Sequence, residues 1–181
     1  MRSPARTSGF SLPELLITIV ILGLVVAVTG NSLLNLARRE RANTVAAELA
    51  GWLDQVNRDA TRFNAQAGGA VCRVTITTGD LAPGEEMANV QPAACATQNI
   101  LTVPDLYFNA PTVQVTANQD QFTFTPRGSV AANDDQVLLT ITVNNQRPLR
   151  CIRLVGLVGV LELGRNNQAG PGGACNEWSR L

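Results

Sequence analysis

The stretch GFSLPELLITIVILGLVVAVT, residues 9–29, decides the fold class of this chain. It holds one charged residue, Glu14, and the next charge along the chain is Arg38. As a helix, about 20 residues extend about 30 Å, at roughly 1.5 Å per residue, and this length matches the hydrocarbon core of a bilayer. We therefore predict a transmembrane helix that begins near Phe10.

The arginines on either side of this stretch bear on its orientation. Arg2 and Arg6 precede it, and basic residues before a span favour a cytoplasmic N-terminus. Arg38, Arg39 and Arg41 follow it and weaken that inference. We expect a single span of the inner (cytoplasmic) membrane, with the N-terminus in the cytoplasm and the rest of the chain extracytoplasmic.

Three simpler explanations compete for the apolar stretch. A secretory signal peptide is cleaved after its apolar run, behind small residues, and residues 29–32 match such a site only loosely. A buried core helix is rarely apolar on every side for this length. A plain transmembrane anchor gives no reason for Glu14. Because a carboxylate at a membrane boundary is costly and by default marks a function, Glu14 argues against all three.

Residues 9–16, GFSLPELL, resemble the signature of type IV prepilins and pseudopilins. Those proteins have a short basic leader, a glycine before the cleavage site, phenylalanine first in the mature chain and glutamate fifth. The resemblance implies that a prepilin peptidase cuts between Gly9 and Phe10 and methylates the new amine of Phe10. It also implies that Glu14 pairs with the amine of a neighbouring subunit during assembly. Pro13 departs from the usual aliphatic residue, but lies in the first helical turn, where its missing N–H costs little.

Beyond Gly30 the helical pattern becomes amphipathic. The apolar residues recur at helical spacing: Val45, Leu49, Trp52, Leu53 and Val56. We expect one helix from about Phe10 to about Phe63, whose second half packs one stripe on a folded head, with Trp52 as a packing anchor. The predicted domains are a leader at 1–9, a transmembrane and filament-core helix half at 10–37, and an extracytoplasmic helix with a β-rich head at 38–181.

After residue 69 the apolar period changes to two, which is typical of strands. The predicted strands cover residues 71–77, 112–116, 121–125, 136–143, 149–155 and 158–163. No alternation of strands and helices is present, so we predict an α+β fold in which the long helix packs on a mainly antiparallel sheet. Residues 81–111, rich in Pro, Ala and Asn, are expected to form a long loop with little regular structure.

The four cysteines, Cys72, Cys95, Cys151 and Cys175, are too far apart for a CxxC metal or redox motif. In an exported domain, dispersed cysteines in even number more often form disulfides. Four cysteines allow three pairings, and their order favours Cys72–Cys95 with Cys151–Cys175.

The composition argues against an enzyme. The chain has no histidine, which removes the commonest general base and a favoured metal ligand. No nucleophile–base pair stands out, and Ser179 is interpreted as a solvent-exposed residue of the tail. We predict neither a catalytic site nor a metal or other cofactor.

Two C-terminal features narrow the family. Residues 122–128, FTFTPRG, resemble an F-x-F-x-P-x-G element of the GspH/FimT-like branch of minor pilins and pseudopilins, although residues 126–128 are interpreted as a tight turn. Residues 150–154, RCIRL, followed by Gly164-Arg165, resemble its C-terminal hairpin.

The resemblance implies a minor pilin that initiates or caps a type IV pilus. The alternatives are an H-type pseudopilin of a type II secretion system, in a periplasmic filament, and a major pilin of a cell-surface pilus. Expected partners are other pilin subunits, the prepilin peptidase and the membrane.

DNA binding is a separate hypothesis, since some FimT-like proteins bind DNA during natural transformation. The C-terminal part has a basic bias, carried by Arg147, Arg150, Arg153, Arg165 and Arg180. Clustered arginines could contact phosphates, but the FimT-like tail has a second basic residue where this chain has residues 166–167, Asn-Asn. The mature chain would carry 12 basic and 14 acidic residues, because residues 1–9 hold two arginines and no acid. This balance argues against binding through bulk charge.

Overall fold

The computed structural model describes residues 11–66, 71–105, 111–125, 127–132, 136–156 and 159–180. Side chains at 27–32 and 64–66 are outside this description, and so are Gly9 and Phe10, the predicted cleavage site. The chain divides into two compact units, Met1–Ala37 and Arg38–Leu181.

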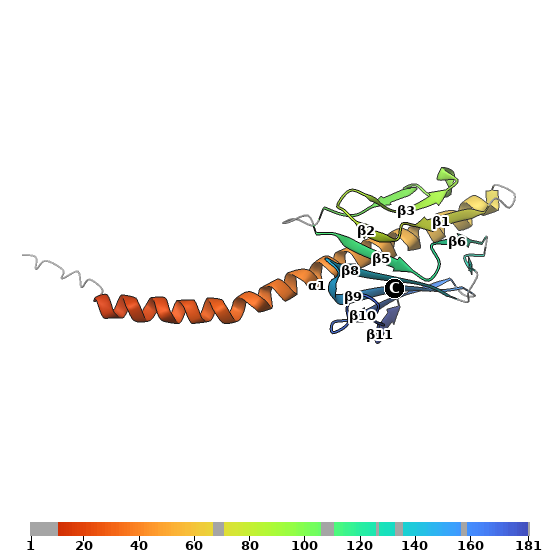
Figure 1. Ribbon diagram of the computed structural model, residues 1–181. Coiled ribbons are helices and arrows are strands. Elements are labelled where there is room, and N and C mark those ends of the chain that lie inside the picture. The colour runs from red at the N-terminus through yellow and green to blue at the C-terminus, as the bar shows by residue number, and fades with distance from the viewer. Residues whose placement is uncertain are drawn as a thin grey trace, which may run out of the picture. The chain divides into compact units, whose positions relative to one another are not determined.

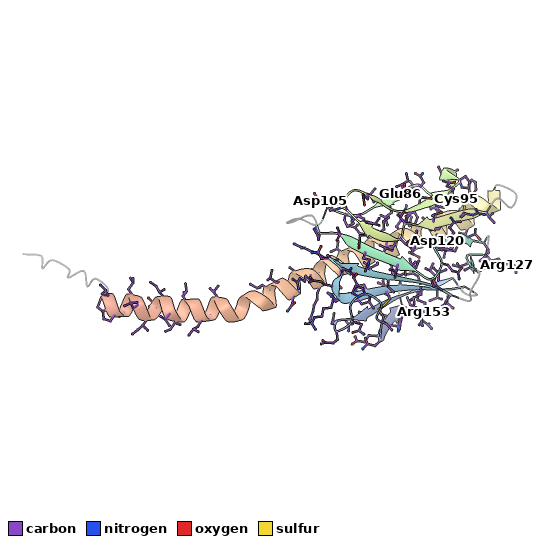
Figure 2. All side chains as sticks on the ribbon, in the orientation of Figure 1. Glu86, Cys95, Asp105, Asp120, Arg127 and Arg153 are labelled. Atoms are coloured by element: carbon purple, nitrogen blue, oxygen red, sulfur yellow. A yellow bond between two sulfur atoms is a disulfide. The ribbon has the colours of Figure 1, made fainter. Side chains whose placement is uncertain are left out.

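Helix α1 (Leu12–Gln66) runs through the first unit and into the second, as the apolar and amphipathic patterns predict. In the first unit, the described side chains of α1 are exposed; Figure 2 draws them as sticks along the N-terminal part of the helix. Within the described part of the chain, no helix is long and apolar enough to span a membrane.

In the second unit, α1 buries one stripe of side chains in the core of the head. The stripe consists of Ala42, Val45, Ala46, Leu49, Ala50, Trp52, Leu53, Val56 and Ala60. Their spacing of three and four residues places them on one face of the helix. The indole of Trp52 is buried and its Nε1 donates to the Gln98 carbonyl at 2.9 Å, so this residue is a packing anchor.

The head contains two antiparallel sheets, and the core lies among them and α1 (Figure 1). The five-stranded sheet has the order β4 (Ile100–Thr102), β3 (Glu86–Gln91), β1 (Cys72–Ile76), β6 (Gln121–Phe124), β7 (Val130–Ala131). The six-stranded sheet has the order β11 (Glu177–Arg180), β10 (Val160–Asn166), β9 (Gln146–Val155), β8 (Gln136–Val143), β5 (Val113–Ala117), β2 (Gly79–Leu81). The chain thus has the predicted α+β class, a long helix packed on antiparallel sheets.

The turns follow from local sequence. Asn144 and Asn145 join β8 to β9 with φ of 53° and 55°, the left-handed conformation that two-residue hairpins require and asparagine tolerates. Between β6 and β7, the Gly128 N–H donates to the Thr125 carbonyl at 2.9 Å, which forms a tight turn; Pro126 lies outside the described residues.

The prediction of a long loop with little regular structure over residues 81–111 is wrong. This segment contains the end of β2, then β3, the 3₁₀ turn η1 (Ala93–Cys95) and β4. Met87, Ala88 and Val90 of β3 are buried, and β3 pairs with both β1 and β4. A bulge between Glu86 and Ala88 places neighbouring side chains in the core, which interrupts the period of two expected of a strand.

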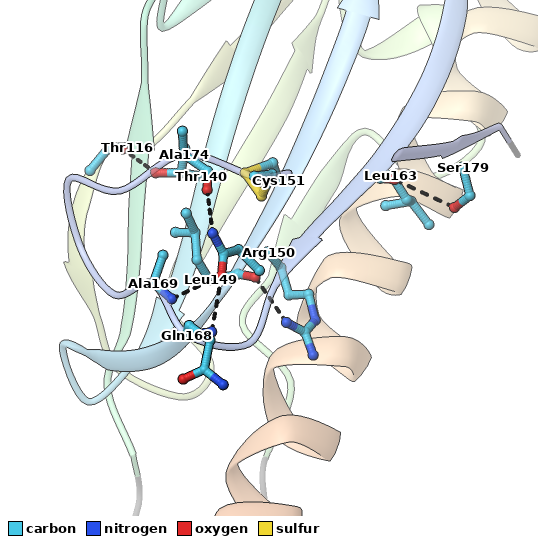
Figure 3. The surroundings of a disulfide bond; sticks show 12 residues. Thr116, Thr140, Leu149, Arg150, Cys151, Leu163, Gln168, Ala169, Ala174 and Ser179 are labelled. Carbon is cyan, nitrogen blue, oxygen red and sulfur yellow. Dashed lines mark hydrogen bonds between the residues drawn. A yellow bond between two sulfur atoms is a disulfide. The ribbon is translucent and has the colours of Figure 1, made fainter. Parts of the chain in front are cut away.

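Strand β11 is also absent from the sequence prediction. Ser179 lies in this strand rather than in a free tail; it is exposed, and its hydroxyl donates to the Leu163 carbonyl at 3.4 Å (Figure 3). The sequence of β11, Glu-Trp-Ser-Arg, has no apolar alternation, and the strand is defined by its antiparallel pairing with β10.

Both disulfides join the cysteine pairs that the order along the chain favours. Cys72 of β1 is bonded to Cys95 of η1, and Cys151 of β9 is bonded to Cys175, just before β11. The second bond, drawn in Figure 3, attaches the segment that leads into β11 to the neighbouring part of the sheet. No free cysteine is present among the described residues.

Candidate functional site

Glu14 lies in the first turn of α1 and is exposed. Its Oε2 accepts from the Ser11 backbone N–H at 3.5 Å and from the Ser11 hydroxyl at 3.3 Å. The Ser11 carbonyl accepts from the backbone N–H of Glu14 and Leu15, at 3.0 and 3.1 Å. A glutamate that reaches back to the N–H of the capping residue is half of a capping box. Glu14 therefore helps to start the helix, where the helix dipole also favours a negative charge.

Ser11 is a residue that the sequence interpretation missed. The signal was present as Ser11-Leu-Pro-Glu14, because serine followed three residues later by glutamate marks a helix start. The same glutamate also belongs to the overlapping signature of Gly9, Phe10 and Glu14, and Glu14 was interpreted only as part of that signature.

The first-unit part of α1 presents apolar side chains all around its circumference. Each of the following is more than half exposed: Leu12, Leu15, Leu16, Ile17, Ile19, Val20, Ile21, Leu22, Leu24, Val25, Val26, Leu33, Leu34 and Leu36. An exposed apolar surface of this extent marks a contact with membrane or with other proteins.

The five C-terminal arginines have different surroundings. Arg153 donates to Glu162 through Nε at 2.9 Å and its guanidinium lies 4.2 Å from the ring centre of Trp178. Arg180 lies 3.7 Å from the other oxygen of Glu162. Arg147 is exposed at the start of β9.

Arg165 pairs with Glu177 at 2.6 Å, across the β10–β11 pairing. Both side chains are more than half exposed, so this pair contributes little to stability. Three of the five arginines proposed for DNA thus already have carboxylate partners: Arg153, Arg165 and Arg180. A phosphate would compete with those carboxylates.

Arg150 differs from the other four because it is 7% exposed and its hydrogen-bond acceptors are neutral. Nε donates to Asn43 Oδ1 of α1 at 2.6 Å, Nη1 to the Leu149 carbonyl at 2.8 Å, and Nη2 to Asn167 Oδ1 at 3.1 Å. Figure 3 shows the side chain directed from β9 toward α1. Arg150 thus links the helix, the sheet and the segment after β10.

The charge state of Arg150 follows from its surroundings. Burial lowers the pKa of its guanidinium, and the positive charges of Arg165 and Arg39 lower it further. Glu40 acts in the opposite direction. An arginine nevertheless stays protonated at neutral pH, so Arg150 is a buried positive charge.

Gly164 has a packing explanation. It lies opposite Trp178 in β11 and opposite Cys151 in β9. A Cβ at this position would lie 2.8 Å from Cζ3 of Trp178 and 2.9 Å from Cβ of Cys175. The glycine of the Gly164-Arg165 pair is therefore explained by the fit of β11 and the disulfide, without a ligand.

No group of His, Cys, Asp and Glu residues in the described segments is arranged to hold a metal ion.

Residues 4–30 match the family model of the prokaryotic N-terminal methylation motif, and this match supports a type IV prepilin or pseudopilin. It includes the predicted cleavage site and Glu14 and ends before the head domain begins. No curated protein and no solved structure matches the chain.

Proposed function

We propose that this chain, a type IV pilin-like protein by its N-terminal methylation motif, is a minor pilin of a type IV pilus. The motif implies a membrane-anchored N-terminus, processing by a prepilin peptidase and assembly with other pilins into a surface filament. In the proposed sequence of events, cleavage follows Gly9, the amine of Phe10 is methylated, and the subunit enters the filament or caps its tip.

The observation that carries this proposal is the motif together with the exposed apolar helix behind it. The apolar side chains of α1 described at 12–26 and 33–36 are exposed, and water is a poor environment for such a surface. Lipid can cover it before assembly, and helices of other subunits can cover it in a filament. A subunit that moves from one environment to the other needs no polar face on this part of the helix.

Glu14 provides the specific contact in this scheme. It is the one charged residue of the sequence segment 11–37. Its proposed partner is the positive amine of Phe10 in a neighbouring subunit. Each charge is costly in an apolar environment when alone, and pairing offsets part of that cost. The pair would favour the one axial position of the subunit at which both charges are satisfied.

A clean deletion strain tests the proposal when surface pili, DNA uptake and exoprotein secretion are scored side by side. Loss of pili or of DNA uptake with secretion intact supports a minor pilin. Loss of secretion with pili intact assigns the chain to the type II secretion pseudopilins instead. The deletion strain could instead retain only traces of filament, while this chain is the most abundant subunit of the parent strain's filaments. That result would assign the chain as a major pilin.

A further inference from the structure

A groove of about 450 Å³ lies in the second unit, between α1 and the β9–β11 end of the six-stranded sheet. Its lining residues come from the helix, from β9 and from the C-terminal strands: Asn43, Ala46, Ala47, Arg150, Leu163, Gly164, Arg165, Glu177, Trp178 and Ser179. The groove is separate from the N-terminal motif and from Glu14.

The walls of the groove are mostly apolar and are shaped by small residues. On the helix side, Ala46 and Ala47 leave space that longer side chains would fill. On the sheet side, Leu163 and the half-buried Trp178 provide apolar surface, and Trp178 is fixed by the guanidinium of Arg153. A ligand with an apolar body fits such walls.

Arg150 places a buried positive charge against this space. No carboxylate among the described residues forms an ion pair with it. Glu40 raises its pKa, but burial and the positive charges of Arg165 and Arg39 lower it. A buried charge without a direct ion-pair partner is costly. A guanidinium has five N–H donors, and three of those on Arg150 are used by Asn43, Leu149 and Asn167. The remaining two can bind a carboxylate, which accepts hydrogen bonds from arginine in pairs.

The net charge of the lining favours a ligand with one negative charge. Arg165 and Glu177 both line the groove and neutralise each other as an ion pair, which leaves Arg150 as the excess charge. Each strand of a DNA duplex presents one phosphate about every 3.4 Å along the helix axis, so a strand laid along the groove would also meet the carboxylate of Glu177. The lining therefore favours a single carboxylate over a polyanion.

We propose that this groove binds a peptide segment of a partner protein that carries one glutamate or aspartate among apolar residues. Arg150 binds the carboxylate, and the apolar neighbours of the acidic residue pack on Leu163, Trp178 and the two alanines. This site goes beyond the filament function and does not depend on which filament the chain joins.

A peptide array provides the test. The full-length chain, kept soluble in an uncharged detergent, is applied to peptides with the pattern apolar–apolar–Glu–apolar–apolar and to twins in which Gln replaces Glu. We expect a family of Glu peptides to be retained about tenfold more strongly than their twins, the effect of one charge-assisted hydrogen bond. Arg150→Gln should abolish this preference.

Two helix variants keep the test valid if Arg150→Gln disturbs folding. Ala47→Phe fills the groove from the exposed side and leaves the three hydrogen bonds of Arg150 in place, so retention of the Glu peptides should be lost. Thr44→Phe, on the exposed surface of the same helix outside the groove lining, is the matched control and should bind like the parent chain.

Several results would overturn the proposal. They are equal retention of Glu and Gln peptides, no retained peptide at all, or a Glu preference that survives Ala47→Phe. Retention of a single-stranded oligonucleotide with Arg150 dependence, in place of the peptides, would identify a nucleic-acid site instead.

Discussion

Glu14 combines a local role with a proposed intermolecular one. Its carboxylate accepts from the backbone N–H and hydroxyl of Ser11 at the start of α1. In a filament, the same carboxylate would face the amine of a neighbouring Phe10. An alanine substitution removes both contacts, so its effect alone does not identify which one matters.

Glutamine at position 14 separates the two roles. We predict that Glu14→Gln is cleaved normally but is missing from filaments, because a Gln side chain can complete the capping box yet carries no charge to pair with the amine. Immunoblots of sheared filaments and of membranes measure this distribution. Glu14→Ala should also be cleaved and fail to assemble.

Two further variants calibrate this experiment. Gly9→Arg should remain uncleaved, because a large side chain blocks a peptidase site that admits glycine. The band of this variant on the immunoblot therefore shows the size of the uncleaved precursor. Ser11→Ala weakens the helix start and leaves the Glu14 charge in place. Filament incorporation of Glu14→Gln at the parental level, or loss of Ser11→Ala from filaments, would assign the importance of Glu14 to the helix start.

At the scale of elements, the packing between β10 and β11 depends on Gly164. We predict that Gly164→Ala lowers the free energy of unfolding by about 1–3 kcal/mol, because overpacking forces Trp178 or Cys175 to move. Thermal unfolding followed by near-ultraviolet circular dichroism measures the change. Gly51→Ala is the control, since its Cβ meets no atom within 4 Å; alanine there should stabilise the helix. An unchanged melting temperature for Gly164→Ala would contradict the packing argument.

The second disulfide should contribute to the stability of the same region. Replacement of Cys151 and Cys175 by serine is predicted to cost about 3 kcal/mol, the usual value for a closed loop of this size. Mass spectrometry of a non-reduced digest checks the pairing directly. A peptide that joins Cys72 to Cys151 would contradict both bonds in the structure.

The elements with strong periodicity could be predicted from the sequence, and those stabilised by their neighbours could not. The length of α1 and strands β8 and β9 follow from runs of apolar residues. Strand β3 contains a bulge and small apolar residues, and β11 has a polar sequence, so both depend on pairing partners that a local pattern does not show. Glu14 was identifiable because its signature is contiguous in the chain.

The groove was beyond sequence interpretation for a related reason. Asn43, Arg150 and Trp178 are far apart in the chain, and only the packing of α1 on the sheet brings them together. The sequence shows Arg150 as one of five similar arginines, whereas the fold buries it and pairs three of the others with glutamates.

At the scale of the whole molecule, charge pairing limits binding to DNA. We predict that the full-length chain retards DNA weakly at about physiological salt, and that Arg165→Gln does not reduce this retardation, because Glu177 already neutralises Arg165. Glu177→Gln should increase retardation by releasing that arginine. A gel-shift titration of the three proteins in uncharged detergent measures the effect.

The opposite result has a clear meaning. Strong retardation that Arg165→Gln abolishes would show that phosphate displaces Glu177, and would support a role in DNA uptake. Retardation that all three proteins share equally would instead be attributed to Arg147 or to the basic residues of α1.

The bond between Cys151 and Cys175 also bears on when the segment that leads into β11 is covalently attached to the sheet. Thiols stay reduced in the cytosol and are oxidised outside it. Among the described strands, β11 pairs with β10 at the edge of the six-stranded sheet. For an exported head, the covalent link between β9 and the segment just before Glu177 and Trp178 would therefore form only after translocation. Before that step, β11 would depend on its backbone pairing with β10, so the groove wall that contains Glu177 and Trp178 would be held less firmly.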